Sequence, residues 1–396
     1  MKRTLVILLA VCFTCANASA QWFLFPGAGK NGASTEIAQT VTDTLETAAP
    51  AVDSLVQDDV FILDRPEVIN VALMLPFNSR TNPDPKFMEM YSGALLALRD
   101  LGNSGAAVNL NVIDFSDAGH PVTEEVINAN DVIIGPVTVD EIRKAYGICS
   151  NARHIVSPLD PKTAALVDSL SIIQAPSPWM SQYDGMVEWI SEDMKFGDKL
   201  FVVTDSGKAG TQSLYLMDLL WEKGIPYSEI CTVKHEYGII GRSLFVICSD
   251  SEGFINNAIR EIDSMSSSSR SKVVLFTTSK ARNASLDPRT LYRTNAHMTA
   301  AYHIDYDDLR VKDFILKYRA LFNAEPGSFA FQGYDALHYF TNICRIYGRM
   351  WFKKLPEYSE RGLQADFKFV QTDKPGLTNT AVRRIVYNKD MTTTLF

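Results

Sequence analysis

The feature that most constrains the fold is an alternation of apolar runs with amphipathic stretches over residues 67–348. The run VINVALMLP (68–76) is almost continuously apolar, which is typical of a strand buried on both faces of a sheet. Residues 86–101 follow with their apolar side chains on one helical face. Strands that alternate with helices at this spacing form parallel, doubly wound sheets. Because the alternation restarts after Pro178, the sequence predicts two α/β lobes.

The same reading predicts the individual elements. Strands are expected at 68–76, 108–115, 131–136, 154–159, 171–176, 199–205, 228–234, 272–278 and 297–302. Helices are expected at 86–101, 138–149, 180–194, 211–223, 255–265, 288–293, 311–322 and 329–346. We expect 68–76, 131–135 and 171–175 in one sheet, and 199–204 and 272–278 in another.

The N-terminal twenty residues have the features of a secretory signal. Met1–Arg3 is cationic, residues 5–13 are apolar but too short to span a bilayer, and Ala18–Ala20 has the small-residue pattern of a cleavage site. This predicts an exported protein with a mature N-terminus at Gln21. A lipoprotein signal would need a small residue just before the lipidated cysteine, and neither cysteine of this segment follows one.

Composition excludes several classes of protein. Hydrophobic residues make up 46% and charged residues 21% of the 396-residue chain, as in ordinary globular proteins. The formal net charge is −8 and there is no basic run, so we expect no nucleic-acid partner. Residues 21–66 are rich in small and polar residues and are interpreted as a flexible N-terminal extension.

Four cysteines follow the signal: Cys149, Cys231, Cys248 and Cys344. An oxidising compartment permits disulfides, and three pairings of four cysteines are possible. The alternative is that most of them are buried thiols that act as small hydrophobic residues.

The sequence contains no complete motif of catalysis or cofactor binding among those that its glycines, serines and histidines suggest. The sequence GAGK (27–30) lacks the leading glycine and the following Ser or Thr of a phosphate-binding loop. No G-x-S-x-G or H-E-x-x-H motif occurs, and the six histidines are scattered. We therefore expect a protein that is not an enzyme and that has no cofactor and no metal site.

An ordered set of segments carries a family resemblance. The segments are NVALMLPFN (70–78), YSGALLALRDL (91–101), DVIIGPVT (131–138), HIVSPL (154–159), KLFVVTDSGKAG (199–210) and FAFQGYDALHYF (329–340). In this order they resemble type I periplasmic solute-binding proteins of the branched-chain amino-acid-binding group. The chain is especially similar to exported binding-protein-like domains of Bacteroidetes-type bacteria, which often follow a peptidoglycan-binding LysM module. Residues 21–66 take the place of that module here.

The resemblance implies two Rossmann-like lobes with parallel sheets, joined by three hinge strands. Lobe one would comprise 67–176 plus 304–348, and lobe two 177–303 plus 349–396. The chain would cross near 175–178, 298–303 and 348–356. It also implies a periplasmic protein whose ligand lies between the lobes.

The expected ligand cleft lies at the carboxyl ends of the strands, where helix N-termini present unpaired N–H groups. Most candidate residues follow directly on buried strands, although each could also serve simple turn or cap chemistry. The candidates in the first lobe are Phe77, Asn78, Ser79, Pro136, Thr138, Ser157, Pro158 and Leu159. Those in the second lobe are Asp205, Ser206, Gly207 and Thr278.

Departures from the family pattern leave the identity of the ligand open. Asp160 and Pro161 stand where an Ala-Thr step is common, and Lys208 stands where a tyrosine is common. Two functions therefore stay open. One is capture of a small solute for a membrane transporter. The other is a non-catalytic interaction module of the cell envelope, with a cell-wall protein or peptidoglycan as partner. The departures also predict weak binding of leucine-like amino acids.

Overall fold

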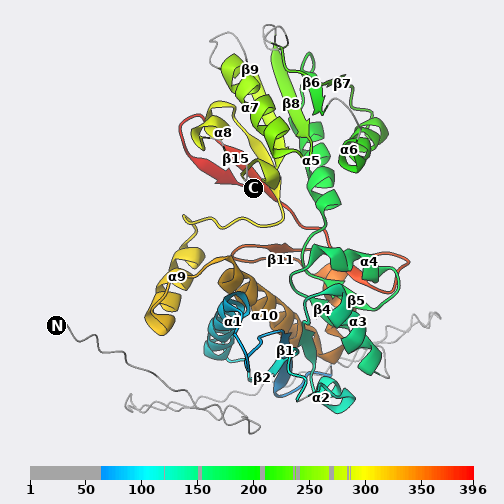
Figure 1. Ribbon diagram of the computed structural model, residues 1–396, viewed down its shortest axis with the longest axis vertical. Helices are drawn as coiled ribbons and strands as arrows, with labels where there is room; N and C mark the ends of the chain where they lie inside the picture. The colour runs from blue at the N-terminus through cyan, green and yellow to red at the C-terminus, as the bar shows by residue number, and fades with distance from the viewer. Residues whose placement is uncertain are drawn as a thin grey trace, which may run out of the picture. The chain divides into compact units, whose positions relative to one another are not determined.

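The computed structural model describes residues 64–119, 121–149, 154–205, 210–234, 237, 241–266, 272–282, 285 and 287–396. Residues Asp64–Phe396 form one compact unit (Figure 1). The expected signal peptide, nearly all of the expected extension, and the candidates Ser206 and Gly207 lie outside the described residues.

The first sheet has seven strands in the order β13-β14-β5-β4-β3-β1-β2. Its strands are β1 (Ile69–Leu75), β2 (Val108–Asp114), β3 (Val132–Ile134), β4 (Ile155–Ser157), β5 (Ile172–Gln174), β13 (Phe369–Gln371) and β14 (Leu377–Asn379). All neighbouring pairs are parallel except β13 and β14. β1, β3, β4 and β5 are almost fully buried, which explains their continuous apolar sequences.

Two helices pack closely against each other over this sheet. They are α1 (Pro85–Asn103) and α10 (Ser328–Tyr347), and their close approach depends on two glycines. A Cβ atom on Gly93 would lie 1.8 Å from the carbonyl oxygen of Ala330, and one on Gly333 would lie 1.9 Å from that of Met90. The remaining elements of this lobe are α2 (Glu124–Asn128), α3 (Val139–Ile148), η1 (Pro161–Thr163), α4 (Ala164–Val167), α9 (Leu309–Phe322), η4 (Gly348–Glu357) and the hairpin strands β11 (Glu360–Arg361) and β12 (Asp366–Phe367).

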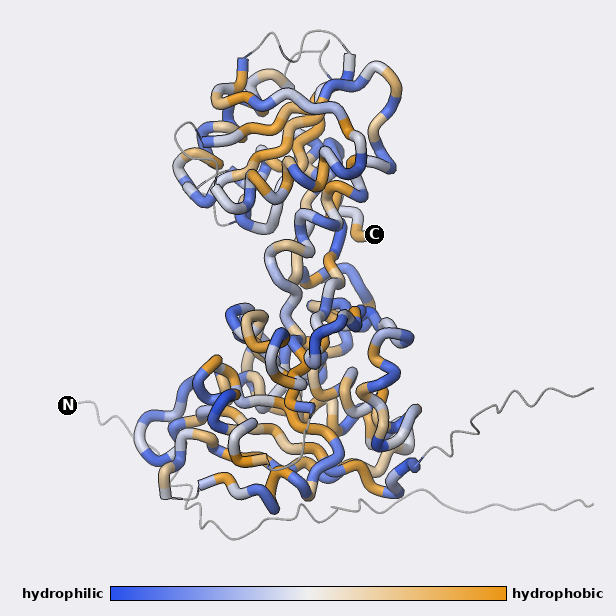
Figure 2. The backbone as a smooth tube through the Cα atoms, turned by 90° about the vertical axis from the view of Figure 1, so that its right-hand side faces the viewer, coloured by the Kyte–Doolittle hydropathy of each residue, from blue (hydrophilic) through white to orange (hydrophobic). Residues whose placement is uncertain are grey.

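The second sheet also has seven strands, in the order β16-β15-β10-β9-β8-β6-β7. Its strands are β6 (Lys199–Thr204), β7 (Ser228–Ile230), β8 (Arg242–Cys248), β9 (Lys272–Thr278), β10 (His297–Ala300), β15 (Arg383–Tyr387) and β16 (Thr393–Leu395). Its helices are α5 (Trp179–Asp193), α6 (Thr211–Glu222), α7 (Glu252–Ser266), η3 (Ser279–Arg282) and α8 (Arg289–Arg293). Figure 2 shows the most hydrophobic stretches in the interior strands of both sheets.

The two-lobe prediction is confirmed. The expected strands at 68–76, 131–135 and 171–175 correspond to β1, β3 and β5 of the first sheet, and those at 199–204 and 272–278 to β6 and β9 of the second. The chain passes from the first sheet to the second between β5 and α5, and it returns between β10 and α9.

The third crossing differs from the expected position near 348–356. The chain stays with the first lobe after α10, because Trp351 and Leu355 of η4 are buried in its core. Leu377 of β14 then pairs with Ile173 of β5. The third crossing lies between β14 and β15, at 380–382. Residues 349–379 therefore belong to the first lobe rather than the second.

The cysteines divide into buried and accessible thiols. Cys248 and Cys344 are buried free thiols, and burial raises their pKa to about 11 and about 12. Cys149 is half-buried and packs against a hydrophobic cluster, whereas Cys231 is exposed, so the small-hydrophobe interpretation holds for Cys248 and Cys344, in part for Cys149, and not for Cys231. Within the described residues, no helix combines the length and apolar character needed to span a membrane.

Candidate functional site

The turn after β1 is held by a carboxylate at the end of β2. Asp114 accepts hydrogen bonds from the backbone nitrogen of Ser79 (2.9 Å) and from its hydroxyl (2.6 Å). The Ser116 hydroxyl also donates to Asp114 and accepts from the backbone nitrogen of Asn78 (2.9 Å). Burial acts to raise the pKa of Asp114, but the bonds from Ser116 and Ser79 outweigh it and lower the pKa. Phe77 is buried beside this turn, so the three candidates here shape the edge of the sheet.

The candidate residues after β3 and β4 also form hydrogen bonds or pack within their own part of the protein. Thr138 caps α3: its hydroxyl accepts the backbone N–H of Glu141, whose carboxylate accepts that of Thr138 (2.9 Å), which confirms the predicted capping box. The hydroxyl of Ser157 is fully buried and lies 2.8 Å from that of Thr163. Pro136 precedes the cap. Pro158 is buried, and Leu159 packs on the first core.

The carboxyl edge of the second sheet carries a network that sequence reasoning did not find. Lys280, just after β9, is ion-paired with Asp250 and donates to the side-chain oxygen of Gln212 (2.9 Å). Tyr183 of α5 donates to the same oxygen (3.0 Å). The four side chains of this network come from helices α5 and α6, the loop after β8 and the turn after β9. These segments are far apart in sequence, so no local pattern predicts the cluster.

Two sequence-derived candidates lie at this edge with different exposure. Asp205 follows β6 and is exposed, whereas Thr278 ends β9 and is buried. The next residue, Ser279, donates from its hydroxyl to Gln182 of α5 (3.1 Å). Asp205 is therefore the candidate of this edge whose charged group is open to solvent. No group of three His, Cys, Asp or Glu side chains suited to a metal ion occurs among the described residues.

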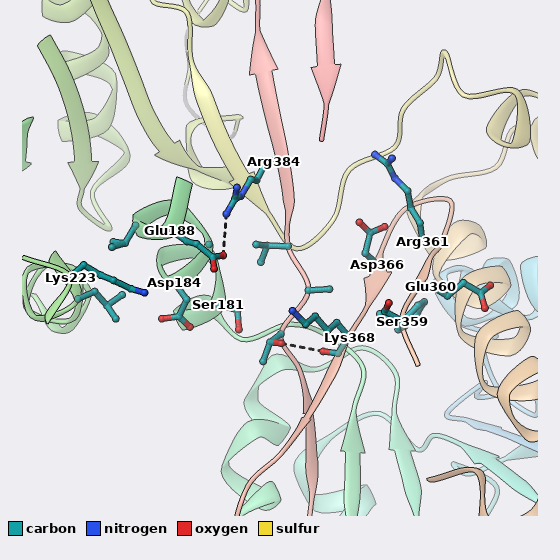
Figure 3. Close-up of a pocket in the computed structure, with 17 residues that line it drawn as sticks. Ser181, Asp184, Glu188, Lys223, Ser359, Glu360, Arg361, Asp366, Lys368 and Arg384 are labelled. Carbon is teal, nitrogen blue, oxygen red and sulfur yellow. Dashed lines mark hydrogen bonds and ion pairs between the residues drawn. The ribbon is translucent and has the colours of Figure 1, made fainter. Parts of the chain in front are cut away.

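A cavity of about 580 Å³ lies elsewhere, beside the third crossing (Figure 3). One wall is the polar face of α5, with Ser181, Asp184 and Glu188 at helical spacing, continued by Lys223 after α6. The opposite wall is the β11–β12 hairpin, through residues 359–361 and 366–368. None of the candidates chosen from the sequence lines this cavity.

The hairpin wall is anchored by a buried carboxylate of α10. Asp335 accepts the backbone N–H groups of Leu363 (2.7 Å), Gln364 (2.8 Å) and Ala365 (3.0 Å). Arg383, at the start of β15, donates to the carboxylate of Asp366 (2.7 Å). These contacts fix the hairpin on one side to α10 and on the other to the third crossing.

Solved structures similar to this chain share its two-lobe arrangement. A putative branched-chain amino acid ABC transporter protein from Rhodospirillum rubrum aligns with a TM-score of 0.53 and 14% identity, covering 83% of this chain and 99% of that one. An ABC-type branched-chain amino acid transporter protein from Rhodopseudomonas palustris aligns with a TM-score of 0.50 and 10% identity, covering 83% and 95%. No protein-family model and no curated protein sequence matches the chain. At these identities the similarity establishes the fold, which is that of type I periplasmic binding proteins.

Proposed function

We propose that the protein is an exported, non-catalytic solute-binding protein of the periplasm, which captures a small molecule and presents it to an ABC-type membrane transporter. The observation that carries the proposal is the fold itself. Two doubly wound sheets are joined by three crossings, in the arrangement of proteins described as components of branched-chain amino acid transporters. In doubly wound sheets, ligands bind outside the carboxyl ends of the strands.

The proposed contacts are the loops at these strand ends. In the first lobe they are Phe77, Asn78, Ser79, Pro136, Thr138, Ser157, Pro158 and Leu159, and in the second Asp205, Ser206, Gly207 and Thr278. Asp205 is the proposed electrostatic contact, because its carboxylate is exposed at the edge of the second sheet. A basic group of the ligand would pair with it.

A thermal-shift screen tests the proposal. The mature chain is screened against amino acids, short peptides, muropeptides and organic acids. A ligand at a hundredfold excess over its Kd stabilises the folded state by about 2.7 kcal/mol. A ligand of the proposed site loses affinity in Asp205→Asn but not in Asp390→Asn, a control on the exposed turn before β16. Failure of the whole panel to stabilise the protein would count against a transport role.

A second candidate function is a cell-envelope interaction module with a repurposed cleft, related to the LysM-associated exported group. It is favoured by the local engagement of the hydroxyls of Ser79, Thr138 and Ser157, each of which already bonds to a protein group. Such a module would bind a cell-wall protein or peptidoglycan fragment and would not respond to small solutes. Stabilisation by muropeptides alone would favour it over solute transport.

A further inference from the structure

The second crossing between the lobes takes only residues 301–303. β10 ends at Ala300 in the second sheet, and Ile304 already packs against a hydrophobic cluster of the first lobe. Hinge motions are absorbed by a few residues between rigid units. Rotation of one lobe against the other must therefore change the backbone at or beside residues 301–303.

One arginine of the second lobe bonds to two of these residues. Arg282 ends η3, the turn that follows β9. Its guanidinium group donates to the carbonyl oxygen of Tyr302 (3.2 Å) and to Nδ1 of His303 (2.8 Å). A further bond, to the hydroxyl of Tyr387 in β15 (3.2 Å), holds the same group to the second sheet. Arg282 thus ties the second crossing to the second lobe.

The first lobe holds the crossing as well. The backbone N–H of His303 donates to the carbonyl oxygen of Gln364 (2.9 Å), in the hairpin that Asp335 anchors to α10. The carbonyl oxygen of His303 accepts from Arg383, at the start of β15. Because His303 is bonded to segments of both lobes, its position depends on both.

The turn η3 connects Arg282 to the proposed solute edge. It begins directly after Thr278, a proposed ligand contact, and its four residues rise by only about 8 Å at about 2 Å per residue. The side chains of Ser279 and Lys280, its first two residues, bond to α5 and α6. A movement at the edge of the second sheet that displaces these two residues therefore also displaces Arg282.

We propose that Arg282 is a positioning residue, which transmits the occupancy of the carboxyl edge of the second sheet to the second crossing and so to the angle between the lobes. The inference deepens the proposed function and rests on it, because it takes that edge to be where the solute binds. A solute that moves η3 shifts the guanidinium group, and with it the two crossing residues that accept its bonds. Binding at the edge is then coupled to the rotation of the lobes.

The bond to the imidazole ring makes this coupling sensitive to acid. A guanidinium group has donors only, so Nδ1 of His303 accepts and the ring is neutral. Burial and the charges of Arg282 and Arg383 lower the pKa of His303 to about 4, against the opposite effect of Asp305. Protonation turns Nδ1 into a donor and removes the bond.

Other charged groups lie on the segments around the ring. Asp366 pairs with Arg383, and Asp335 holds the hairpin. Burial raises the pKa of Asp335 to about 6, so this carboxyl is mostly protonated by pH 5. An effect that appears between about pH 5 and about pH 3.5 is therefore separated from its titration.

Hydrogen exchange of the ligand-free mature protein, measured by mass spectrometry, tests the proposal. The readout is the protection of residues 301–308, with residues 131–138 of the first lobe as reference. In Arg282→Gln the protection of 301–308 should fall about tenfold at pH 7, as expected for loss of a charge-assisted bond, and the reference should not change. Arg293→Gln is the matched control, because Arg293 pairs with Asp263 in the same lobe and should leave both peptides unchanged.

Two further variants distinguish coupling from simple stabilisation. The double variant Ser279→Ala/Lys280→Gln frees η3 from α5 and α6, and should lower the protection of 301–308 about threefold, as expected for a partly exposed ion pair. In His303→Asn a side-chain oxygen can accept the bond without titrating. This variant should keep the protection at pH 7 and should lose the fall that the unchanged protein shows between about pH 5 and about pH 3.5.

Three results would overturn the inference. One is an equal loss of protection in both peptides of Arg282→Gln, because the arginine would then stabilise the whole fold. Another is a double variant that leaves 301–308 unchanged, because η3 would then not connect the edge to the crossing. The third is a fall with acid that His303→Asn retains. All readouts are taken without a ligand, so these failures are distinct from failure of the solute screen.

Discussion

The side chain of Arg383, at the start of β15, forms hydrogen bonds with the β11–β12 hairpin and with the second crossing between the lobes. It is 1% exposed, and it donates from two nitrogens to one oxygen of Asp366 (3.0 and 2.7 Å). It also donates to the carbonyl oxygens of Gly362 (2.7 Å) and Leu363 (3.1 Å) in the hairpin, and of His303 in the second crossing. We expect Arg383→Met to destabilise the protein strongly, because these acceptors lose a shared buried donor.

The magnitude follows from burial. Removing one partner of a buried ion pair costs about 3–5 kcal/mol. The side chain of Asp366 is 22% exposed, so solvent reaches it in part, and we expect the lower end, about 3 kcal/mol. The adjacent Arg384 is the matched control, since its partners Glu188 and Glu192 are 65% and 58% exposed. Exposed pairs contribute about 0–1 kcal/mol each, so Arg384→Met should cost about 1 kcal/mol.

Calorimetric unfolding distinguishes these values. At about 2.1 cal/mol/K per residue, a folded unit of roughly 330 residues loses about 1.4 °C of Tm per kcal/mol, so Arg383→Met should lower Tm by about 4 °C and Arg384→Met by about 1.4 °C. Arg383→Lys should recover little, because an ammonium group cannot reproduce the planar fork of donors. Equal losses in the two methionine variants would refute the reasoning.

Further predictions concern packing, acid stability and ligand choice. Gly93→Ala should destabilise by at least about 2 kcal/mol in urea unfolding, because the new Cβ lies 1.8 Å from the carbonyl oxygen of Ala330. Gly102→Ala in the same helix meets nothing within 4 Å and should stabilise by about 0.5–1 kcal/mol, so a loss in both variants would contradict the close packing. Burial lowers the pKa of His154 and of His303 to about 4, whereas the unfolded chain takes up these protons near pH 6.5. The unfolded state therefore binds more protons between these values, and stability should fall as the pH drops from about 6.5 to about 4. His154→Gln should flatten that fall in pH-dependent melting curves, and an unchanged slope would exclude His154 as a cause. In calorimetric titration, leucine, isoleucine and valine should not bind tighter than about 100 μM, roughly −5.5 kcal/mol, because the first-lobe hydroxyls are already bonded. Micromolar binding would show that other groups supply the charge contacts.

The central strands could be predicted from the sequence because burial on both faces leaves a continuous apolar run. The expected strand 272–278 coincides with β9, and 199–205 differs from β6 by one residue. The last strands could not be found in this way. β13, β14 and β16 have three residues each, and their sequences FVQ, LTN and TTL show no sustained apolar pattern. Their place in the sheets is decided by pairing with distant strands.

The third crossing was misplaced for a related reason. The family resemblance implies that the chain leaves the first lobe directly after α10, near 348–356. Trp351 and Leu355 instead bury against the first core, a choice that depends on tertiary contacts rather than on local pattern. The cavity beside the crossing could not be predicted from the sequence for the same reason. Its α5 residues have the spacing of an ordinary solvated helix face, and only the fold brings the hairpin opposite them.

The carboxyl edge of the first sheet shows why position after a strand does not by itself identify a ligand contact. The hydroxyl of Ser79 donates to the carboxylate of Asp114 (2.6 Å), and the bonds from Ser116 and Ser79 outweigh burial and lower the pKa of that carboxyl. A ligand that uses this hydroxyl must compete with a charge-assisted bond. Thr138 and Ser157 are engaged in the same way by a helix cap and by Thr163. Under the proposed function, recognition at this edge would therefore depend on backbone groups and on shape, and Asp205 on the opposite sheet would be the charged contact.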